Sequence, residues 1–248
     1  MKIHLIGTSH GAPEKNRGCT AILLETQGQY YVIDTGSSVE KYMMDNDLDV
    51  EAINAIFISH MHEDHVGTLT GLLKVLKTYH GTARANVYLP EKEGIEALRV
   101  WLNAMHSINW PENRLPLLLT TEGDVYSDEY VKVSAVKTDH IKGDFDSFAY
   151  IIEGEGKRLL ITGDLTDDLH DYPQVALEED FDAVVSELCH YRKGFGFIPG
   201  TIEKIKATKT KQIIFTHIYP GADDDMRKVE DTLPFEIHIA NDGDIFEI

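Results

Sequence analysis

Four side chains that can bind a metal lie close together near the end of the first quarter of this chain. They belong to the stretch Ile-Phe-Ile-Ser-His-Met-His-Glu-Asp-His-Val-Gly, and they are His60, His62, Asp64 and His65. Neutral imidazoles together with a carboxylate suit a borderline cation such as zinc. A set without cysteine is more typical of a catalytic metal site than of a structural one. Such dense spacing argues against the alternative, a solvated loop that is rich in histidine by accident.

The elements on either side must turn this cluster into a pocket. Residues 54–59 form an apolar run that predicts a buried strand, and leucines with helical spacing follow between residues 69 and 76. The cluster therefore lies on a tight turn between a strand and a helix. Alternate residues at a strand end point the same way, so His60 and His62 can face one point. Asp64 and His65 come after the bend and can face a second point nearby.

The cluster resembles the His-x-His-x-Asp-His signature of the metallo-β-lactamase superfamily. That family carries further motifs along its domain, and this chain matches them in order, each after an apolar run. The matching residues are Asp34 after Tyr-Val-Ile, His140 after Val-Lys-Thr-Asp, Asp164 after Leu-Ile-Thr-Gly and His217 after Ile-Ile-Phe-Thr. Side chains at the ends of different strands can converge at one edge of a sheet. Asp164 has a second interpretation, since it could cap a helix that begins near Thr166.

The resemblance implies a ligand set for two divalent cations. The ligands of the first ion would be His60, His62 and His140, and those of the second Asp64, His65 and His217. Asp164 would bridge both ions, while Asp34 would orient the cluster without binding metal. A hydroxide held between the ions would be the nucleophile, since such cations lower the pKa of bound water to about 7. Zinc is the expected metal, with manganese and iron as alternatives.

Candidate residues for steps other than metal binding are fewer. Asp64 and Asp34 are candidate catalytic residues within the motifs, and His190 is a third outside them. His190 begins a segment, residues 190–197, that combines two cations with aromatics and glycines. His190 could donate a proton to a leaving group, and Arg192 could hold a phosphate through two hydrogen bonds. Lys193 and His10 are further candidates for substrate binding; the alternatives are a solvated loop at 190–197 and a simple turn at His10.

The bulk composition bounds the kind of protein. The chain has 248 residues, with 42% hydrophobic and 26% charged residues, which fits a single globular domain over residues 1–248. Only Cys19 and Cys189 are cysteines, and neither a signal peptide nor a membrane-spanning run is evident. We therefore expect a soluble, cytoplasmic protein with Cys189 as a small buried hydrophobe. The net charge of −19 disfavours a general nucleic-acid binder, although a pocket with two cations can still accept a phosphate ester.

Strand-like runs alternate with helical patterns along the whole chain, which predicts the α/β (α+β) class. The superfamily resemblance implies a four-layer αββα sandwich of two mixed sheets flanked by helices. Residues 236–240 and 245–248 both read as strands, and Asn241-Asp242-Gly243 between them predicts a hairpin. The stretch from Trp101 to Pro116 could cover the pocket or mediate a homodimer.

The opening Gly-Thr-Ser-His-Gly-Ala-Pro, residues 7–13, resembles the ribonuclease Z-like branch, which includes small phosphodiesterases. The chain departs from true ribonuclease Z, because it shows no basic Gly/Pro-rich insertion that could grip tRNA. Its Ser-Glu-Leu-Cys-His at 186–190 matches the His-Glu-Ala-Thr motif only in part. A phosphodiesterase for a small phosphodiester is therefore expected, with no membrane partner. The alternatives are a lactonase, thioesterase or β-lactamase, a ribonuclease Z-type endonuclease, and a metal-binding module without turnover.

Overall fold

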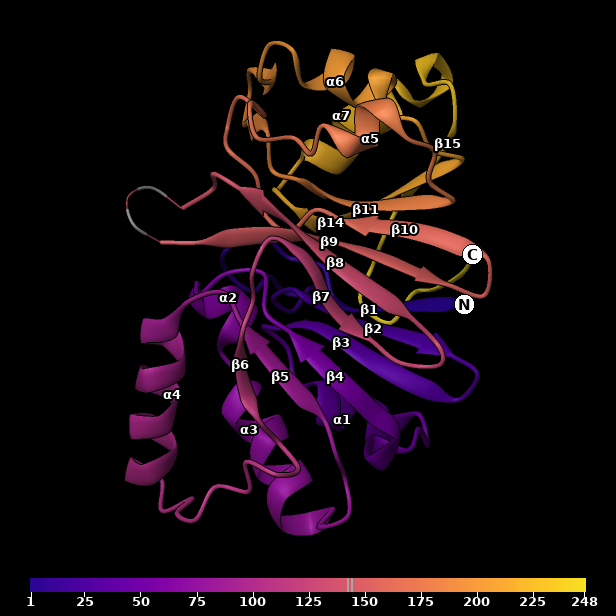
Figure 1. Ribbon diagram of the computed structural model, residues 1–248. Helices are drawn as coiled ribbons and strands as arrows, with labels where there is room; N and C mark the ends of the chain where they lie inside the picture. Colours follow the sequence, from indigo (N-terminus) through magenta and orange to yellow (C-terminus); the bar gives the residue numbers. More distant parts are fainter. Residues whose placement is uncertain (142, 144) are drawn as a thin grey trace.

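Two mixed β-sheets of seven strands each pack face to face, and helices cover the outer face of each sheet (Figure 1). The structure is a computed structural model that describes residues 1–141, 143 and 145–248. This arrangement confirms the αββα sandwich that the superfamily resemblance implies. Across the described residues, no helix is both long enough and apolar enough to cross a lipid bilayer.

The first sheet has the strand order β16-β1-β2-β3-β4-β5-β6. Its strands are β1 (Lys2–Gly7), β2 (Ala21–Thr26), β3 (Gln29–Thr35), β4 (Ile53–Phe57), β5 (Asn86–Leu89), β6 (Leu117–Leu119) and β16 (Ile245–Glu247). The helices on this side are α1 (Val39–Asp45), α2 (Glu63–Val66), α3 (Leu69–Lys74) and α4 (Lys92–Ala104), with the short helical turns η1 (Val50–Ala52) and η2 (Val75–Tyr79). The Ser38 side chain caps α1 by accepting a hydrogen bond from the backbone N–H of Lys41.

The second sheet has the strand order β15-β14-β11-β10-β9-β8-β7. Its strands are β7 (Gly123–Ser127), β8 (Lys132–Thr138), β9 (Ser147–Gly154), β10 (Lys157–Ile161), β11 (Ala183–Leu188), β14 (Gln212–Ile218) and β15 (Glu236–Ile239). The helices on this side are α5 (Val175–Glu178), α6 (Thr201–Ala207), α7 (Ala222–Arg227) and the short turn η3 (Glu230–Thr232). A small hairpin of β12 (Tyr191–Arg192) and β13 (Gly196–Phe197) follows β11.

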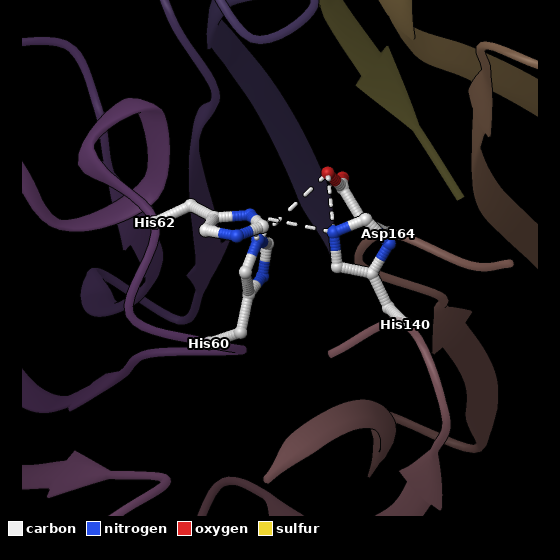
Figure 2. Close-up of side chains that lie close together, drawn as sticks. All are labelled: His60, His62, His140 and Asp164. Carbon is white, nitrogen blue, oxygen red and sulfur yellow. Dashed lines mark hydrogen bonds and ion pairs between the residues drawn. The ribbon is translucent and has the colours of Figure 1, made fainter. Parts of the chain in front are cut away.

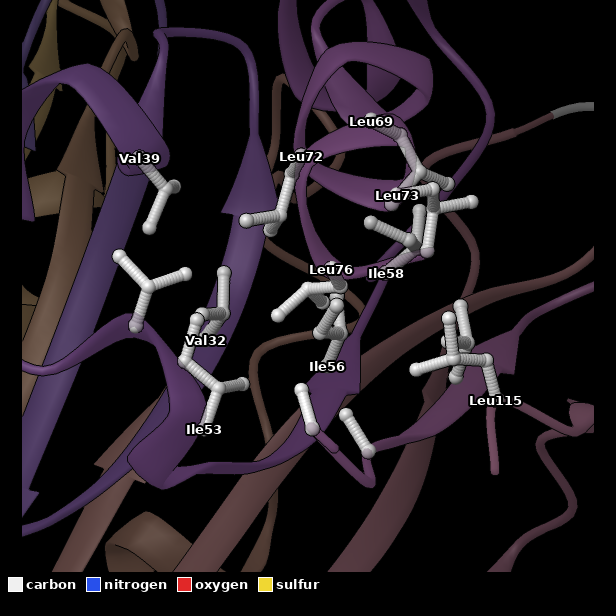
Figure 3. Packing of buried hydrophobic residues seen from close by; sticks show 14 of the residues in the cluster. Val32, Val39, Ile53, Ile56, Ile58, Leu69, Leu72, Leu73, Leu76 and Leu115 are labelled. Carbon is white, nitrogen blue, oxygen red and sulfur yellow. The ribbon is translucent and has the colours of Figure 1, made fainter. Parts of the chain in front are cut away.

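The core forms three apolar layers because the inner strands are buried on both faces. On β3, Val32 packs outward with the helices, while its neighbour Ile33 packs between the two sheets. Figure 3 shows the outer layer, where Leu72 and Leu76 of α3 and η2 lie against Ile56 of β4. Alternation along each strand thus provides one apolar face for the helices and another for the partner sheet.

The predicted hairpin at the end of the chain is wrong. β16 pairs with β1 in the first sheet, whereas β15 pairs with β14 in the second. The carboxylate of Asp242 accepts hydrogen bonds from the backbone N–H groups of Thr8, at 2.9 Å, and Gly18, at 2.5 Å. The turn is therefore held by the amino-terminal segment, and it carries the chain from one sheet to the other.

The parallel strands of both sheets bring their carboxyl ends to a common edge. β3 runs parallel to β4, and β10, β11 and β14 run parallel to one another. A backbone hydrogen bond of 3.0 Å from Phe148 N to Ser59 O joins the second sheet to the segment that follows β4. Residues at the carboxyl ends of β3 and β14 and shortly after β4 and β10 can therefore meet between the sheets.

Candidate metal centre

The first candidate ligands lie on a short connection between β4 and α2. His60 follows β4 closely, and His62 is the residue that precedes the first turn of α2. The connection packs tightly on the segment after β3, because a Cβ atom on Gly36 would lie 1.8 Å from the carbonyl oxygen of Asp64. Only glycine allows this approach, and the approach holds Asp64 and His65 at the sheet edge.

The first group consists of three imidazoles and one carboxylate. His60 Nε2 lies 2.9 Å from His62 Nδ1, and His140 Nε2 lies 3.3 Å from the same nitrogen. The Asp164 carboxylate completes the group, with Oδ2 at 3.8 Å from His60 Nε2 and 3.7 Å from His140 Nε2. Figure 2 shows His60 and His62 approaching from one side and His140 from the other. One atom from each residue can reach a common ion, since these atoms lie within 4.8 Å of one another.

The second group shares Asp164 and adds Asp64, His65 and His217. His65 Nε2 lies 3.3 Å from Asp64 Oδ2 and 3.3 Å from Asp164 Oδ1. His217 Nε2 lies 3.2 Å from Asp64 Oδ2 and 3.3 Å from Asp164 Oδ2. The two groups thus meet at Asp164, as the sequence interpretation requires of a shared ligand.

The donor atoms of both groups fit divalent cations. Nitrogen and carboxylate oxygen are the ligands that zinc accepts in catalytic sites. Among the described residues, His65 Nε2 and Asp164 Oδ1 are buried without a hydrogen-bond partner, although each faces the shared point. A buried polar atom without a partner is costly, and a cation between these atoms would remove that cost.

The charges inside the centre shift the pKa values of its members. Burial alone would lower the pKa of His65, but the carboxylates of Asp164 and Asp34 outweigh burial and raise it well above its ordinary value. His217 follows the same pattern, with Asp164 as the main opposing charge. Burial opposes ionisation of Asp64, yet the His217 and His65 rings beside its carboxylate, at 3.2 Å and 3.3 Å, hold its pKa well below the usual range. Without metal, protons compensate the carboxylates; bound cations would take over that role.

Asp34 lies behind the cluster, at the end of β3. Its Oδ2 accepts hydrogen bonds of 2.7 Å from His65 Nδ1 and from Ser59 Oγ, and its Oδ1 accepts one of 2.7 Å from Ser59 N. His60 Nδ1 in turn lies 3.0 Å from Ser59 Oγ. Asp34 therefore contacts the side of the His65 ring that faces away from Asp64 and Asp164, and its expected role of orienting the cluster without binding metal stays a prediction.

The structure buries His190 and leaves Arg192 and Lys193 exposed. His190 is 4% exposed, with Nε2 at 3.2 Å from Glu187 Oε1 and Nδ1 at 3.3 Å from the Asp167 carbonyl oxygen. A solvated loop is therefore the wrong interpretation for His190. Arg192 and Lys193 lie on the exposed β12–β13 hairpin, and their predicted contact with substrate stays a prediction.

His10 lies at a bend close to the carboxyl end of β14. Its ring centroid is 5.2 Å from that of Tyr219, two residues after His217, and its Nε2 lies 3.6 Å from Glu14 Oε1. The helix that Asp164 could have capped is not formed. Residues 165–174, all of them described, contain turns and bends, and α5 begins only at Val175.

Two residues of this region were not expected to have a functional part. Glu187 is a buried carboxylate at the end of β11, and Cys189 makes polar contacts with His217, so the assignment of Cys189 as a plain hydrophobe is wrong. Burial raises the pKa of the Cys189 thiol to about 12. The sequence held one signal, namely an acidic residue inside the otherwise apolar run Ala-Val-Val-Ser-Glu-Leu.

Comparison with known proteins identifies the family of the chain. A family model described as Anti-Pycsar protein Apyc1 matches residues 1–195. A curated ribonuclease Z from Exiguobacterium sp. strain AT1b is 28% identical over 171 residues, which cover 68% of this chain and 54% of that protein. The chain thus spans about half the length of the curated relatives it matches, 54% and 46% for two of them.

Solved structures confirm the fold. The metallo-β-lactamase fold protein YhfI from Bacillus subtilis superposes with a TM-score of 0.77 at 18% identity, covering 100% of this chain and 99% of that one. Zn²⁺-bound PqqB from Methylobacterium extorquens superposes with a TM-score of 0.67 at 15% identity, covering 100% of both chains. The predicted membership of the metallo-β-lactamase superfamily, in its ribonuclease Z-like branch, is therefore confirmed. The expectation that nucleic acid is an unlikely partner finds no support in relatives named ribonuclease Z.

Proposed function

The chain belongs to the family described as Anti-Pycsar protein Apyc1, and we propose that it is a metal-dependent hydrolase that cleaves a small phosphodiester. The observation that carries this proposal is the pair of ligand groups that share the Asp164 carboxylate. Two cations held through one shared carboxylate are a recurring arrangement in enzymes that hydrolyse phosphoesters.

His60, His62 and His140 would hold the first ion, Asp64, His65 and His217 the second, and Asp164 both. Zinc suits this nitrogen and oxygen set, and manganese or iron would also be accepted. When bound, divalent cations supply a water of lowered pKa, about 7, and polarise phosphoryl oxygens. The acidic surface of the chain, with a net charge of −19, makes this local positive charge necessary for holding a phosphate.

The remaining roles belong to side chains of the protein itself. Asp64 stays ionised because His217 hydrogen-bonds to it and the His65 ring lies beside it, so it presents a negative charge to the pocket at neutral pH. Asp34 fixes the His65 ring through the 2.7 Å contact at Nδ1. Exposed Arg192 and Lys193 could bind the phosphate from the β12–β13 hairpin, and His190 could supply a proton to the leaving group.

Endonucleolytic cleavage of RNA is the second candidate, and the ribonuclease Z relatives favour it. The net charge of −19 weighs against a large polyanion, because nucleic-acid enzymes usually present a basic face. A precursor tRNA assayed beside a small diester at the same salt concentration would separate the two. Lactone, thioester and nitrocefin assays cover the carboxylic substrates of the wider superfamily.

The test of the proposal is hydrolysis of bis-(p-nitrophenyl) phosphate with added zinc or manganese. Asp64→Ala should lower the rate by more than about 100-fold, because it removes a ligand of the second ion, and loss of even an orienting partner costs about 10–100-fold in metal sites. Asp224→Ala, which removes an exposed carboxylate on α7, is the matched control and should leave the rate unchanged. Equal rates for the wild type and Asp64→Ala would refute the proposal.

Metal content tests the dinuclear centre separately from activity. The wild type should bind about two ions per chain, since two-metal hydrolases hold their ions roughly 3.5–4 Å apart through shared ligands. His217→Ala should keep about one ion, and Asp164→Ala should bind neither tightly, because Asp164 belongs to both groups. A wild type that saturates at one ion under excess zinc and manganese would contradict the two-ion centre.

A further inference from the structure

His217 occupies an irregular place in the second sheet. Glu187 pairs with Thr216 and Leu188 pairs with Ile218, so the register between β11 and β14 skips His217. The skipped residue has a φ of 47°, which lies in the left-handed region that side chains other than glycine rarely adopt. The irregularity turns the imidazole toward the cluster, with Nε2 at 3.2 Å from Asp64 Oδ2. Something must hold a residue in so unfavourable a conformation.

Cys189 touches His217 at two points. The Sγ atom lies 3.0 Å from His217 Nδ1 and 2.9 Å from the carbonyl oxygen of the same residue. We propose that Cys189 is a positioning residue for His217, which its thiol holds at both the ring and the backbone. This inference rests on the proposed metal centre, because it concerns how one ligand of that centre is oriented.

The proton positions follow from simple chemistry. A carbonyl oxygen only accepts, so the contact of 2.9 Å requires the Cys189 thiol to donate its proton to His217 O. Nε2 of His217 faces Asp64 and Asp164 and must present a lone pair to an ion, which leaves the ring proton on Nδ1. Nδ1–H then donates to Sγ at 3.0 Å, with Glu187 Oε2 as a second acceptor at 3.5 Å. One thiol therefore fixes the tautomer, the ring orientation and the strained backbone together.

Glu187 strengthens this arrangement from the neighbouring strand. Its Oε1 accepts a hydrogen bond of 2.5 Å from the backbone N–H of Leu165, the residue after Asp164. The carboxylate thus ties the segment of the shared ligand to the far side of the His217 ring. Cys189 and Glu187 thus contact Nδ1 of His217 in the same way as Asp34 contacts Nδ1 of His65.

A competing interpretation makes Cys189 a metal ligand. Glu187, Cys189 and His217 each offer an atom within 4.8 Å of the others, so a third ion could in principle lie there. Binding would require the thiolate and a free Nδ1, and both contacts of the thiol would be lost. Sulfur would bind the metal in this interpretation but not in the proposal, and the spectrum of the cobalt(II)-substituted protein distinguishes the two.

The experiment compares Cys189→Ala, Cys189→Ser and Cys19→Ala with the wild type. Zinc affinities are measured by competition with a chromophoric chelator, and cobalt(II) spectra are recorded for each protein. Cys189→Ala should weaken one of the two ions by about 10–100-fold and leave the other unchanged, as loss of an orienting partner does elsewhere. Cys189→Ser should restore most of the loss, because a hydroxyl can donate to the carbonyl and accept from Nδ1–H. Cys19→Ala removes the other thiol, which makes no hydrogen bond among the described residues, and should bind both ions normally.

Each outcome decides the matter. The unchanged affinity for the first ion shows that Cys189→Ala is folded, so a selective loss supports the proposal. Two ions bound with wild-type affinity in Cys189→Ala, or equal losses in the Ala and Ser variants, would overturn it. A thiolate-to-cobalt charge-transfer band in the wild type would overturn it too, in favour of a sulfur ligand. Failure of the wild type to bind two ions would instead contradict the underlying metal centre.

Discussion

Replacing Asp34 with Asn tests how the centre is oriented from behind. Asp34 accepts hydrogen bonds of 2.7 Å from Ser59 N, Ser59 Oγ and His65 Nδ1. An Asn side chain keeps one acceptor oxygen but presents an N–H₂ group in place of the other. The φ of 60° at position 34 does not prevent the substitution, because Asn tolerates the left-handed region better than most residues. The substitution therefore changes the hydrogen bonds while it spares the backbone.

The expected cost follows from the tautomer of His65. A carboxylate can only accept, so Nδ1 of His65 carries a proton, and Nε2, which faces Asp64 and Asp164, would give up its own proton and offer a lone pair when a cation binds. An amide N–H₂ facing Nδ1 favours the opposite tautomer, with a proton on Nε2 where the ion would bind. We expect the second ion to bind about 100-fold more weakly, roughly 2.7 kcal/mol, the upper end for loss of an orienting partner. The first ion should be unaffected.

Competition with a chromophoric chelator at fixed pH measures both affinities. Asp128→Asn is the matched control, since Asp128 is a part-buried carboxylate that, like Asp34, accepts several hydrogen bonds, among them one of 2.6 Å from Tyr31 Oη. That control should lose stability and keep both ions. Wild-type affinity for both ions in Asp34→Asn, or an equal loss in Asp128→Asn, would refute the tautomer argument.

Three further predictions concern packing and pH. Gly36→Ala should lower the free energy of unfolding by about 1–3 kcal/mol and weaken metal binding, because the new methyl would lie 1.8 Å from the Asp64 carbonyl oxygen. Denaturant titrations and metal-binding assays measure the two effects. In the control, Gly11→Ala, the new methyl would meet nothing within 4 Å, so stability and metal binding should both stay unchanged. Leu72→Ala should cost about 2–5 kcal/mol in urea unfolding, since Leu72 is fully buried in the outer layer of Figure 3, and a loss below about 1 kcal/mol would contradict that packing. Burial lowers the pKa of His4 below its ordinary value of 6.5. His4 therefore makes its full contribution to the free energy of unfolding above pH 6.5, and that contribution is lost as the pH falls toward the pKa that His4 has in the folded protein. Thermal midpoints of His4→Gln should therefore fall less than those of the wild type between pH 7.5 and 5, and parallel curves would show that His4 does not titrate in this way.

The sequence was a good guide to the fold where periodicity and turn residues agreed. The buried run over residues 54–59 and the helical leucine pattern between residues 69 and 76 both appear close to their expected places. The chain end was predicted wrongly, because Asn-Asp-Gly specifies a turn but not the sheet that receives the next strand. The sheet that receives the last strand depends on hydrogen bonds from the backbone N–H groups of Thr8 and Gly18 to the Asp242 carboxylate. These residues are 234 and 224 positions away from Asp242 in the sequence. Local patterns carry no information on such contacts.

The same limit divides the candidate centre into a predictable and an unpredictable part. Residues that face the metal position form dense motifs after apolar runs, so their residue types and spacing identify them. Residues that hold them lack such a pattern, and Cys189 acts on His217 only because the pairing of β11 with β14 skips that residue. Asp34, which contacts His65, and His217 both have left-handed backbones, with φ of 60° and 47°. Strain of this kind is tolerated only where surrounding contacts impose it. The orienting hydrogen bonds behind His65 and His217 are therefore as much a part of the centre as the ligands, although spacing alone does not reveal them.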